Sequence, residues 1–254
     1  MIISVVNQKG GVGKTTTAVN LSAYLAAMGK FVLLIDIDPQ TNATSGIGVD
    51  KNRIEKSSYE VLLGDVNARD ALSSLFMPTL KIMPSSPNLA GATIELVNQP
   101  NREFALTNAL LEIKNDFDFI IIDCPPSLDL LTINGLVAAD YVLIPIQAEY
   151  YALEGLGSLL NTFNLIKENL KPNLNVLGSV ITMYDKRNSL ARDVMNEMYK
   201  NFPFKIFRSV IPRNVRLTEA PSYGQSILQY DSKSKGGKAY ERLAKEILDH
   251  FSWQ

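Results

Sequence analysis

The residues with the clearest chemical potential lie near the start of the chain, where Lys9–Thr16 reads KGGVGKTT. A strand is predicted just before it at Ile2–Val6, and a helix opens at Lys14. Glycines let the backbone curl so that successive N–H groups point at phosphates, and the helix dipole adds positive potential. Lys14 would reach the outer phosphates and the Thr15 hydroxyl would ligate Mg²⁺. The candidate nucleotide-binding residues here are Lys9, Gly10, Gly11, Val12, Gly13, Lys14, Thr15 and Thr16.

This loop departs from the usual phosphate-loop pattern at its first position. The pattern spaces two glycines by four residues and ends in Gly-Lys-Ser/Thr. Counting back from Gly13 puts Gln8 in the place of the first glycine. The loop instead carries an additional lysine, Lys9. Lys9 is either a surface lysine or a second cation aimed at phosphates, including those held by another subunit, as an arginine finger works in trans.

Three aspartates follow apolar segments further along the chain. Asp36 and Asp38 come after the predicted strand Phe31–Ile35, and Asp123 comes after Phe119–Ile122. The carboxyl ends of strands form the ligand edge of an open parallel sheet. We expect Asp123 to hold the metal through its water, and Asp36 and Asp38 to contact metal-bound water or orient the attacking water. A single aspartate at a strand end is more often a helix cap, but three beside a phosphate loop favour catalysis.

The elements that must position these residues alternate along the chain. Strands are predicted at Ile2–Val6, Phe31–Ile35, Leu80–Met83, Phe119–Ile122, Tyr141–Ile146 and Val176–Met183. Helices are predicted at Thr15–Met28, Asn101–Lys114, Leu128–Ala138, Leu153–Asn169, Leu190–Asn201 and Lys238–Phe251. Loops are predicted at Asp38–Lys51, Pro84–Gly91, Met183–Ser189 and Ser222–Gly237. Continuous apolar strands in strand–helix–strand order predict one α/β domain over residues 1–254, with a mostly parallel twisted sheet of seven or eight strands and helices on both faces.

Composition narrows the class of protein. The chain has 254 residues, 46% of them hydrophobic, which is enough for a sizeable core. One cysteine, Cys124, excludes an internal disulfide framework and is typical of a reducing compartment. We expect no signal peptide, because no basic segment precedes the first strand, and no apolar run approaches the roughly 20 residues of a membrane span. His250, the single histidine, is expected to mark a helix end and not a catalytic base.

Charge is distributed unevenly along the chain. Lys186–Lys238 holds 11 lysines and arginines against 4 aspartates and glutamates, whereas the remainder holds 14 against 22. Such asymmetry is typical of a surface that binds a polyanion. On charge alone, a solvated basic face without a ligand fits equally well.

Several segments together resemble the ParA/Soj chromosome-partitioning ATPases. They are Lys9–Thr16, Asp36–Gln40, Asp123–Ser127, Gln147–Gly155 (QAEYYALEG) and Ile211–Pro221 (IPRNVRLTEAP). This family belongs to the deviant Walker A group, which includes MinD and the nitrogenase iron protein. The resemblance runs nearly end to end and implies a P-loop fold, with ATP and Mg²⁺ as cofactors.

The resemblance also implies roles for individual residues. In that family two subunits sandwich two ATP molecules, and the lysine matching Lys9 crosses to the partner's phosphates. The aspartate matching Asp38 polarises the hydrolytic water, and Gly10 matches a position with no room for a larger side chain in the dimer. Pro212 and Asn214 match the loop that contacts adenine. The expected catalytic residues are Lys9, Lys14 and Asp38, and the expected metal contacts are Thr15, Asp36 and Asp123.

The implied cycle is a switch. The ATP dimer binds DNA non-specifically, and a ParB/Spo0J-type partner stimulates slow hydrolysis and releases it. Arg187 and Arg216 match arginines of the DNA-binding surface, and both lie in the basic segment. Further expected DNA contacts are Lys233, Lys235 and Lys238. We expect binding through phosphates that weakens with salt, in a cytoplasmic, nucleoid-associated protein. Arg213 and Arg216 flank the base-binding loop, and a structural role for both stays open.

Other functions have their own signatures. A MinD-like membrane ATPase needs a free amphipathic C-terminal helix with a basic polar face, whereas the polar side of Lys238–Phe251 mixes both charges, so we expect that helix to dock on the core. An iron–sulfur carrier needs interface cysteines, and Cys124 is better explained as a small buried side chain. A nucleotide-gated scaffold without a catalytic role stays open.

Because the chain starts at the phosphate-loop strand, we expect no operator-binding helix-turn-helix before it.

Overall fold

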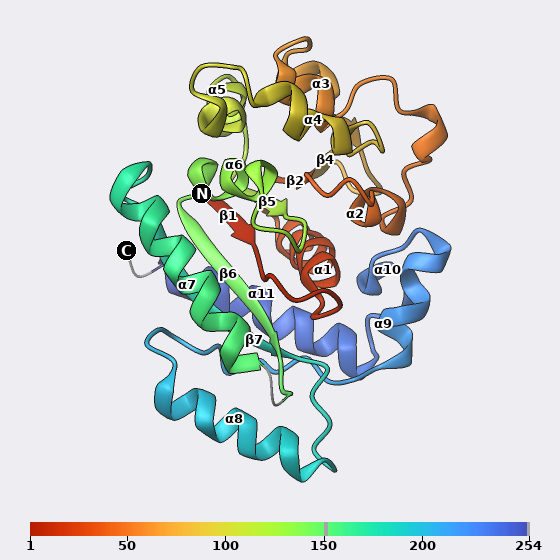
Figure 1. Ribbon diagram of the computed structural model, residues 1–254. Helices are drawn as coiled ribbons and strands as arrows, with labels where there is room; N and C mark the ends of the chain where they lie inside the picture. The colour runs from red at the N-terminus through yellow and green to blue at the C-terminus, as the bar shows by residue number, and fades with distance from the viewer. Residues whose placement is uncertain (150–151, 253–254) are drawn as a thin grey trace.

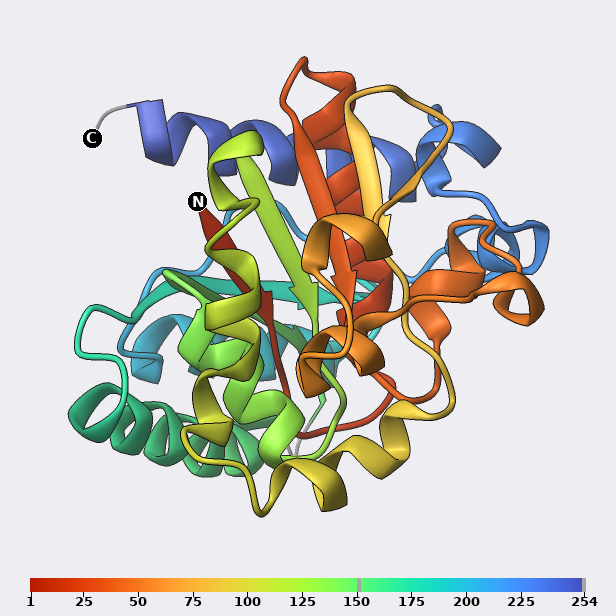
Figure 2. The same cartoon turned by 90° about the horizontal axis from the view of Figure 1, so that it is seen from above.

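The computed structural model describes residues 1–149 and 152–252 and contains one seven-stranded sheet in the order β3-β4-β2-β5-β1-β6-β7. The strands are β1 (Ile2–Val5), β2 (Val32–Asp36), β3 (Ser73–Ser74), β4 (Leu80–Met83), β5 (Phe119–Asp123), β6 (Tyr141–Gln147) and β7 (Asn175–Thr182). All neighbours pair in parallel except β3 and β4, which pair antiparallel. Helices flank both faces of the sheet (Figures 1 and 2). The expected α/β fold with a mostly parallel sheet is confirmed.

The helices agree with the sequence where they are long. They are α1 (Lys14–Ala27), α2 (Asn42–Gly46), α3 (Ser58–Leu63), α4 (Leu89–Leu96), α5 (Ala105–Leu110), α6 (Leu130–Ala138), α7 (Ala152–Asn169), α8 (Ser189–Asn201), α9 (Val215–Glu219), α10 (Ile227–Asp231) and α11 (Lys235–Ser252). The single helix expected at Asn101–Lys114 is wrong: only α5 is α-helical, between 3₁₀ turns at Arg102–Phe104 and Lys114–Asp116. His250 lies in the last turn of α11, as expected.

Several expected loops contain helical residues. One is Pro84–Gly91, where α4 begins at Leu89. The helix α2 lies within Asp38–Lys51, and α10 and the start of α11 lie within Ser222–Gly237. Gly236 and Gly237 lie at the end of the expected loop Ser222–Gly237, but they are buried in the first turn of α11. A Cβ at Gly236 would lie 2.7 Å from Leu217 Cγ, and one at Gly237 would lie 2.5 Å from the Ser232 carbonyl oxygen. These glycines therefore allow close packing of α11 against α9 and the turn before it.

The sheet separates two hydrophobic cores. Successive side chains of a strand point to opposite faces. In β2, Leu33 and Ile35 belong to a core shared with α3–α7, whereas Val32 and Leu34 belong to a core shared with α1 and α11. Both faces are covered, which explains why the central strands are continuously apolar. Because β1, β2 and β5 are parallel, their carboxyl ends meet at one edge of the sheet.

The C-terminal helix α11 packs beside α1 on one face of the sheet (Figures 1 and 2). Tyr240, Leu243 and Ile247 are buried in the core there. The expectation of a docked C-terminal helix is therefore confirmed. Among the helices that the structure describes, none is both long and apolar enough to cross a membrane. Of the segment Gln147–Gly155, residues 150 and 151 lie outside the described residues.

Candidate nucleotide-binding site

The phosphate loop joins the end of β1 to the start of α1. Gly11 and Gly13 have φ of 76° and 87°, in the left-handed region that favours glycine. A Cβ added at Gly10 would meet no heavy atom of the described chain within 4 Å. The fold therefore explains two of the three glycines, while a limit on side-chain size at Gly10 has no source within the described part of one subunit.

Two polar side chains fix this loop to the sheet. Thr182, at the end of β7, donates its hydroxyl to the Val12 carbonyl oxygen at 2.7 Å. Asn7 donates its amide to the Pro145 carbonyl oxygen at 2.7 Å and accepts from the Lys9 N–H at 3.0 Å. Sequence reasoning missed Asn7 and Thr182, because an isolated polar residue at a strand end belongs to no periodic pattern.

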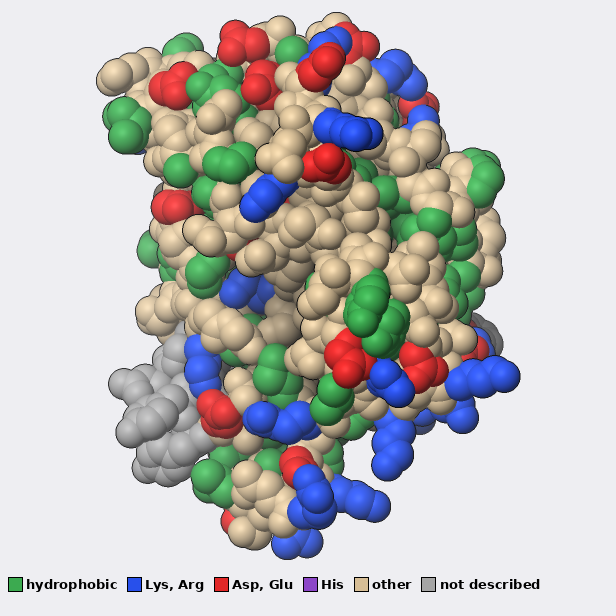
Figure 3. All heavy atoms as spheres, turned by 90° about the vertical axis from the view of Figure 1, so that its right-hand side faces the viewer, with side chains coloured by type: hydrophobic (Ala, Val, Ile, Leu, Met, Phe, Trp, Pro, Cys, Tyr) green, Lys and Arg blue, Asp and Glu red, His purple; other side chains and the backbone are tan. Residues whose placement is uncertain are grey.

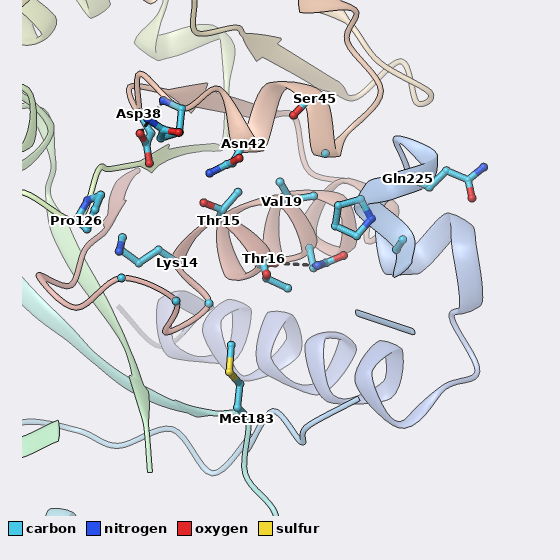
Figure 4. Close-up of a pocket in the computed structure, with 18 residues that line it drawn as sticks. Lys14, Thr15, Thr16, Val19, Asp38, Asn42, Ser45, Pro126, Met183 and Gln225 are labelled. Carbon is cyan, nitrogen blue, oxygen red and sulfur yellow. Dashed lines mark hydrogen bonds between the residues drawn. The ribbon is translucent and has the colours of Figure 1, made fainter. Parts of the chain in front are cut away.

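Lys14 opens α1 and is 7% exposed. Its ammonium donates to the Lys9 carbonyl oxygen at 3.2 Å. Burial lowers the pKa of Lys14, while the nearby charges of Asp123 and Asp38 oppose that shift. Figure 4 shows Lys14, Thr15 and Asp38 around one cavity. The fold thus gathers the predicted phosphate-binding lysine and the predicted carboxylates in one place.

Asp123 ends β5 and is fully buried. Neither of its carboxylate oxygens has a hydrogen-bond partner among the residues that the structure describes. Burial, followed by the charge of Asp36, raises the pKa of Asp123 well above its usual value, and Thr15 and Lys14 oppose the shift. A buried carboxylate without a partner is costly unless something else satisfies it. Asp123 beside Thr15 and Lys14 therefore fits a hydrated Mg²⁺ bound with nucleotide phosphates.

Asp36, at the end of β2, is also fully buried but accepts three hydrogen bonds. Its Oδ1 accepts from the Asp38 N–H at 3.0 Å, and its Oδ2 accepts from the N–H and hydroxyl of Thr44 at 2.8 and 2.7 Å. Burial raises the pKa of Asp36 to about 6, and these hydrogen bonds oppose the rise. Asp36 therefore holds the Asp38 turn and α2 in place. Its contact with metal-bound water stays a prediction.

Asp38 is 5% exposed and lines the cavity with Lys14. Its Oδ1 accepts from the Gln40 N–H at 2.9 Å, and its carbonyl oxygen accepts from the Ser85 hydroxyl at 2.8 Å. The backbone around Asp38 is thus fixed from two sides, by Asp36 and by Ser85. This fixed position suits a residue expected to orient a water molecule.

Two cavities meet at the phosphate loop. The first, about 480 Å³, is lined by phosphate-loop residues and Asp38. The second, about 300 Å³, is lined by Pro212 and Asn214 and shares Gly13, Thr16 and Met183 with the first. Both residues expected to contact adenine therefore lie beside the phosphate loop. We expect the first cavity to hold phosphates and the second, more apolar cavity, called the base cavity below, to hold adenine.

Lys9 lies on the rim of this site. Its ammonium pairs with Glu149 Oε2 at 2.6 Å, and both side chains are partly exposed. In this structure Lys9 is therefore engaged by its own subunit. Its reach to a partner's phosphates stays a prediction.

None of the expected DNA contacts lines either of the two nucleotide cavities. Arg187 follows β7, Arg216 is on α9, and the lysines surround the start of α11. All five predicted side chains are exposed. An isolated bridge between Tyr184 and Pro212 brings the Arg187 segment beside the one that leads into α9. Figure 3 shows lysine and arginine side chains gathered in the lower half of the face that carries α9 and α10, with acidic side chains among them.

The chain is similar to known proteins over most of its length. A family model described as an AAA domain matches residues 1–176. Sporulation initiation inhibitor protein Soj from Bacillus subtilis is 52% identical over 246 residues, 97% of each chain. Chromosome partitioning protein ParA from Myxococcus xanthus is 50% identical over 97% of this chain and 87% of its own. The chain belongs to the ParA/Soj family of chromosome-partitioning ATPases. The family resemblance inferred from the sequence is therefore confirmed.

A solved structure shares this fold closely. Cobyrinic acid a,c-diamide synthase from Mycobacterium smegmatis, with a bound ATP analogue and magnesium, superposes with a TM-score of 0.88 at 38% identity, covering 99% of this chain and 95% of its own. The expected ATPase activity, with ATP and Mg²⁺ as cofactors, agrees with this neighbour and with the ParA/Soj family.

Proposed function

We propose that this chain is an ATP-driven dimerisation switch that binds DNA non-specifically and acts in chromosome or plasmid partitioning with a ParB-type partner. One observation carries the proposal. The lining of the base cavity includes Asn214 and Leu217 and, from α11, Tyr240. The same two elements, α9 and α11, carry Arg216 and Lys238 on the surface. Nucleotide and DNA would therefore act on the same pair of helices.

The chain's own residues supply most of the nucleotide chemistry. Lys14 binds the outer phosphates, and the loop amides and the start of α1 add positive potential. Thr15 and, through water, Asp123 would hold magnesium, which would neutralise phosphate charge. Asp38 accepts a hydrogen bond from the attacking water and directs it at the terminal phosphate. Because Asp38 and Lys14 are nearly buried, these interactions are little screened by solvent.

Dimerisation explains how DNA binding would follow ATP binding. Lys9 lies partly exposed on the rim, where it can reach a second subunit, and Gly10 leaves space beside it. Two subunits double the number of cations that face DNA, so the affinity rises by avidity. Each phosphate contact releases counterions, which makes the binding sensitive to salt.

A membrane-binding ATPase is the alternative. It needs an apolar helix face that is free to enter the headgroup region. The apolar side of α11 is instead buried, with Ala239, Tyr240, Leu243, Ala244 and Ile247 in the core. This burial favours the DNA proposal.

A sedimentation experiment tests the proposal against this alternative. The purified protein with Mg-ATP is mixed with either long duplex DNA of random sequence or anionic phospholipid vesicles. We expect co-sedimentation with DNA and not with vesicles. Binding to vesicles alone would overturn the proposal in favour of the membrane function.

A further inference from the structure

Both arginines expected on DNA are engaged by acidic side chains of their own chain. Arg187 makes a two-pronged contact with Asp185, with Nη2 2.7 Å from Oδ2 and Nε 3.0 Å from Oδ1. Arg216 Nη1 lies 2.9 Å from Glu219 Oε2, and its Nε lies 3.7 Å from Asp231 Oδ2. A guanidinium offers DNA phosphate the same fork that it offers a carboxylate. In each case a carboxylate already pairs with the guanidinium that a DNA phosphate would contact.

These acids are held in place by further hydrogen bonds. Asp185 Oδ1 also accepts from the Arg187 N–H at 3.0 Å, so the carboxylate is tied to the backbone of the same turn. Glu219 also accepts from the Tyr230 hydroxyl at 3.1 Å, which links α9 to α10. Each carboxylate is therefore positioned beside its arginine by more than the ion pair alone.

The placement of the acids is selective. Lys186–Lys238 contains only four acidic residues, and two of them, Glu219 and Asp231, lie against Arg216. Within the described residues, no ion pair involves Lys233, Lys235 or Lys238, although all three are exposed. The acids therefore neutralise the two arginines and leave the nearby lysines free of ion pairs.

The contacts are open to exchange. The Arg187 side chain is 85% exposed, so a phosphate can approach it from solvent. Solvent screens exposed ion pairs, and a phosphate offers the guanidinium the same two-pronged geometry, so a phosphate can replace the carboxylate. The hydrogen bonds from Arg187 hold the pKa of Asp185 well below its usual range. An aspartate without such partners is also ionised near neutral pH, so Asp185 keeps its charge after displacement. The displaced carboxylate then remains close to the DNA and repels it.

We propose that Asp185 and Glu219 compete with DNA phosphates for Arg187 and Arg216, and thereby hold the DNA affinity of each subunit below what its cations would otherwise give. This inference rests on the proposed DNA-binding function. Its consequence is that one subunit binds DNA too weakly to stay attached, and a dimer with two such surfaces is needed. The acids therefore sharpen the dependence of DNA binding on the ATP dimer.

The test is an equilibrium DNA titration in Mg-ATP at fixed salt. Asp185→Asn keeps an oxygen to accept from the Arg187 N–H, and Glu219→Gln keeps one for Tyr230. Each variant is expected to bind DNA about 2- to 10-fold more tightly than the original protein, since two copies of a weak ion pair are removed per dimer. In an Arg187→Ala background, Asp185→Asn is expected to give a smaller gain, because the competed group is gone.

Asp193→Asn is the matched control. Asp193 is an exposed acid on α8, and among the described residues it pairs with no arginine. Asp193→Asn changes the net charge by the same amount as Asp185→Asn but releases no arginine. It is therefore expected to change the DNA affinity less. Equal gains in DNA affinity from Asp185→Asn and Asp193→Asn would overturn the competition. So would the absence of any gain from both Asp185→Asn and Glu219→Gln while the original protein binds DNA. Absence of DNA binding by the original protein would overturn the proposed function itself.

Discussion

Asp36 and Asp123 occupy paired positions at the ends of the neighbouring parallel strands β2 and β5. Their sequence contexts are alike, since each aspartate ends an apolar strand. Their surroundings differ, because Asp36 accepts three hydrogen bonds while Asp123 accepts none from the described residues. Asp36 thus builds the turn that carries Asp38, and Asp123 is the carboxylate left available for magnesium-bound water.

Loss of the Lys14 side chain tests the phosphate pocket. Lys14→Ala is expected to weaken ATP binding about 100-fold or more, because a charge-assisted contact to phosphate is lost in a nearly buried site. Calorimetric titration with Mg-ATP measures it. Lys51→Ala, which removes an exposed lysine elsewhere, should leave the affinity unchanged. Normal ATP affinity in Lys14→Ala would contradict the phosphate-loop assignment.

Loss of the Asp38 carboxylate should separate binding from hydrolysis. Asp38→Ala is expected to lower turnover about 100-fold or more, within the range of general acid–base contributions, because the attacking water loses its acceptor. ATP binding and dimerisation should persist, since Asp38 is not expected to bind the phosphates. Phosphate release measures turnover, and light scattering measures dimerisation in ATP. Unchanged turnover would assign the water-orienting role to another group.

At the scale of elements, the sequence predicted the strands with continuous apolar runs and the long helices. All six expected strands are present, because continuous apolar runs mark strands covered on both faces. The strand β3 was missed because two residues form no pattern. The short helices α2, α3, α4, α9 and α10 were missed for a related reason, since each has only five to eight residues, about one to two turns. Their positions depend on distant contacts, such as that of Thr44 with Asp36.

The contact between α1 and α11 gives a prediction at this scale. The buried hydroxyls of Tyr240 and Thr17 are 3.2 Å apart and share a hydrogen bond. Tyr240→Phe is expected to destabilise the protein by about 1 kcal/mol, because Thr17 loses a buried partner. Chemical denaturation measures the free energy of unfolding.

Tyr24 provides the matched control for this variant. It is also buried on the same face, but its hydroxyl has no hydrogen-bond partner among the described residues. Tyr24→Phe should therefore cost little or even stabilise the fold. If the two substitutions changed the unfolding free energy equally, the hydrogen bond would not contribute to docking of α11.

At the scale of the whole molecule, the chain places its nucleotide residues and its basic residues on shared elements. The sequence named candidates for both groups, through motif segments and through the family resemblance, and their individual roles stay predictions. It did not predict that Arg187 and Arg216 would be paired with acids. Asp185 lies close to Arg187 in the sequence, but Asp231 reaches Arg216 only because α10 folds back on α9. Such contacts depend on the packing of short helices.

The two arginines yield a prediction for the assembled dimer. Arg187→Ala with Arg216→Ala is expected to abolish most DNA binding while ATP-dependent dimerisation persists. The slope of log Kobs against log salt should become less steep by about 4, for two lost contacts in each of two subunits. A salt titration of the variant measures this slope. Retained affinity with an unchanged slope would place the DNA surface elsewhere on the molecule.

The central claim is that ATP controls DNA binding, and the most direct test compares DNA affinity in different nucleotide states. The purified protein is titrated with long non-specific duplex DNA in the presence of ATP, ADP or no nucleotide, each with magnesium and across a salt series. We predict measurable binding only with ATP, with an affinity that falls steeply and log-linearly as salt rises. Equal binding in all three states, or none in any state despite ATP-driven dimerisation, would contradict the account.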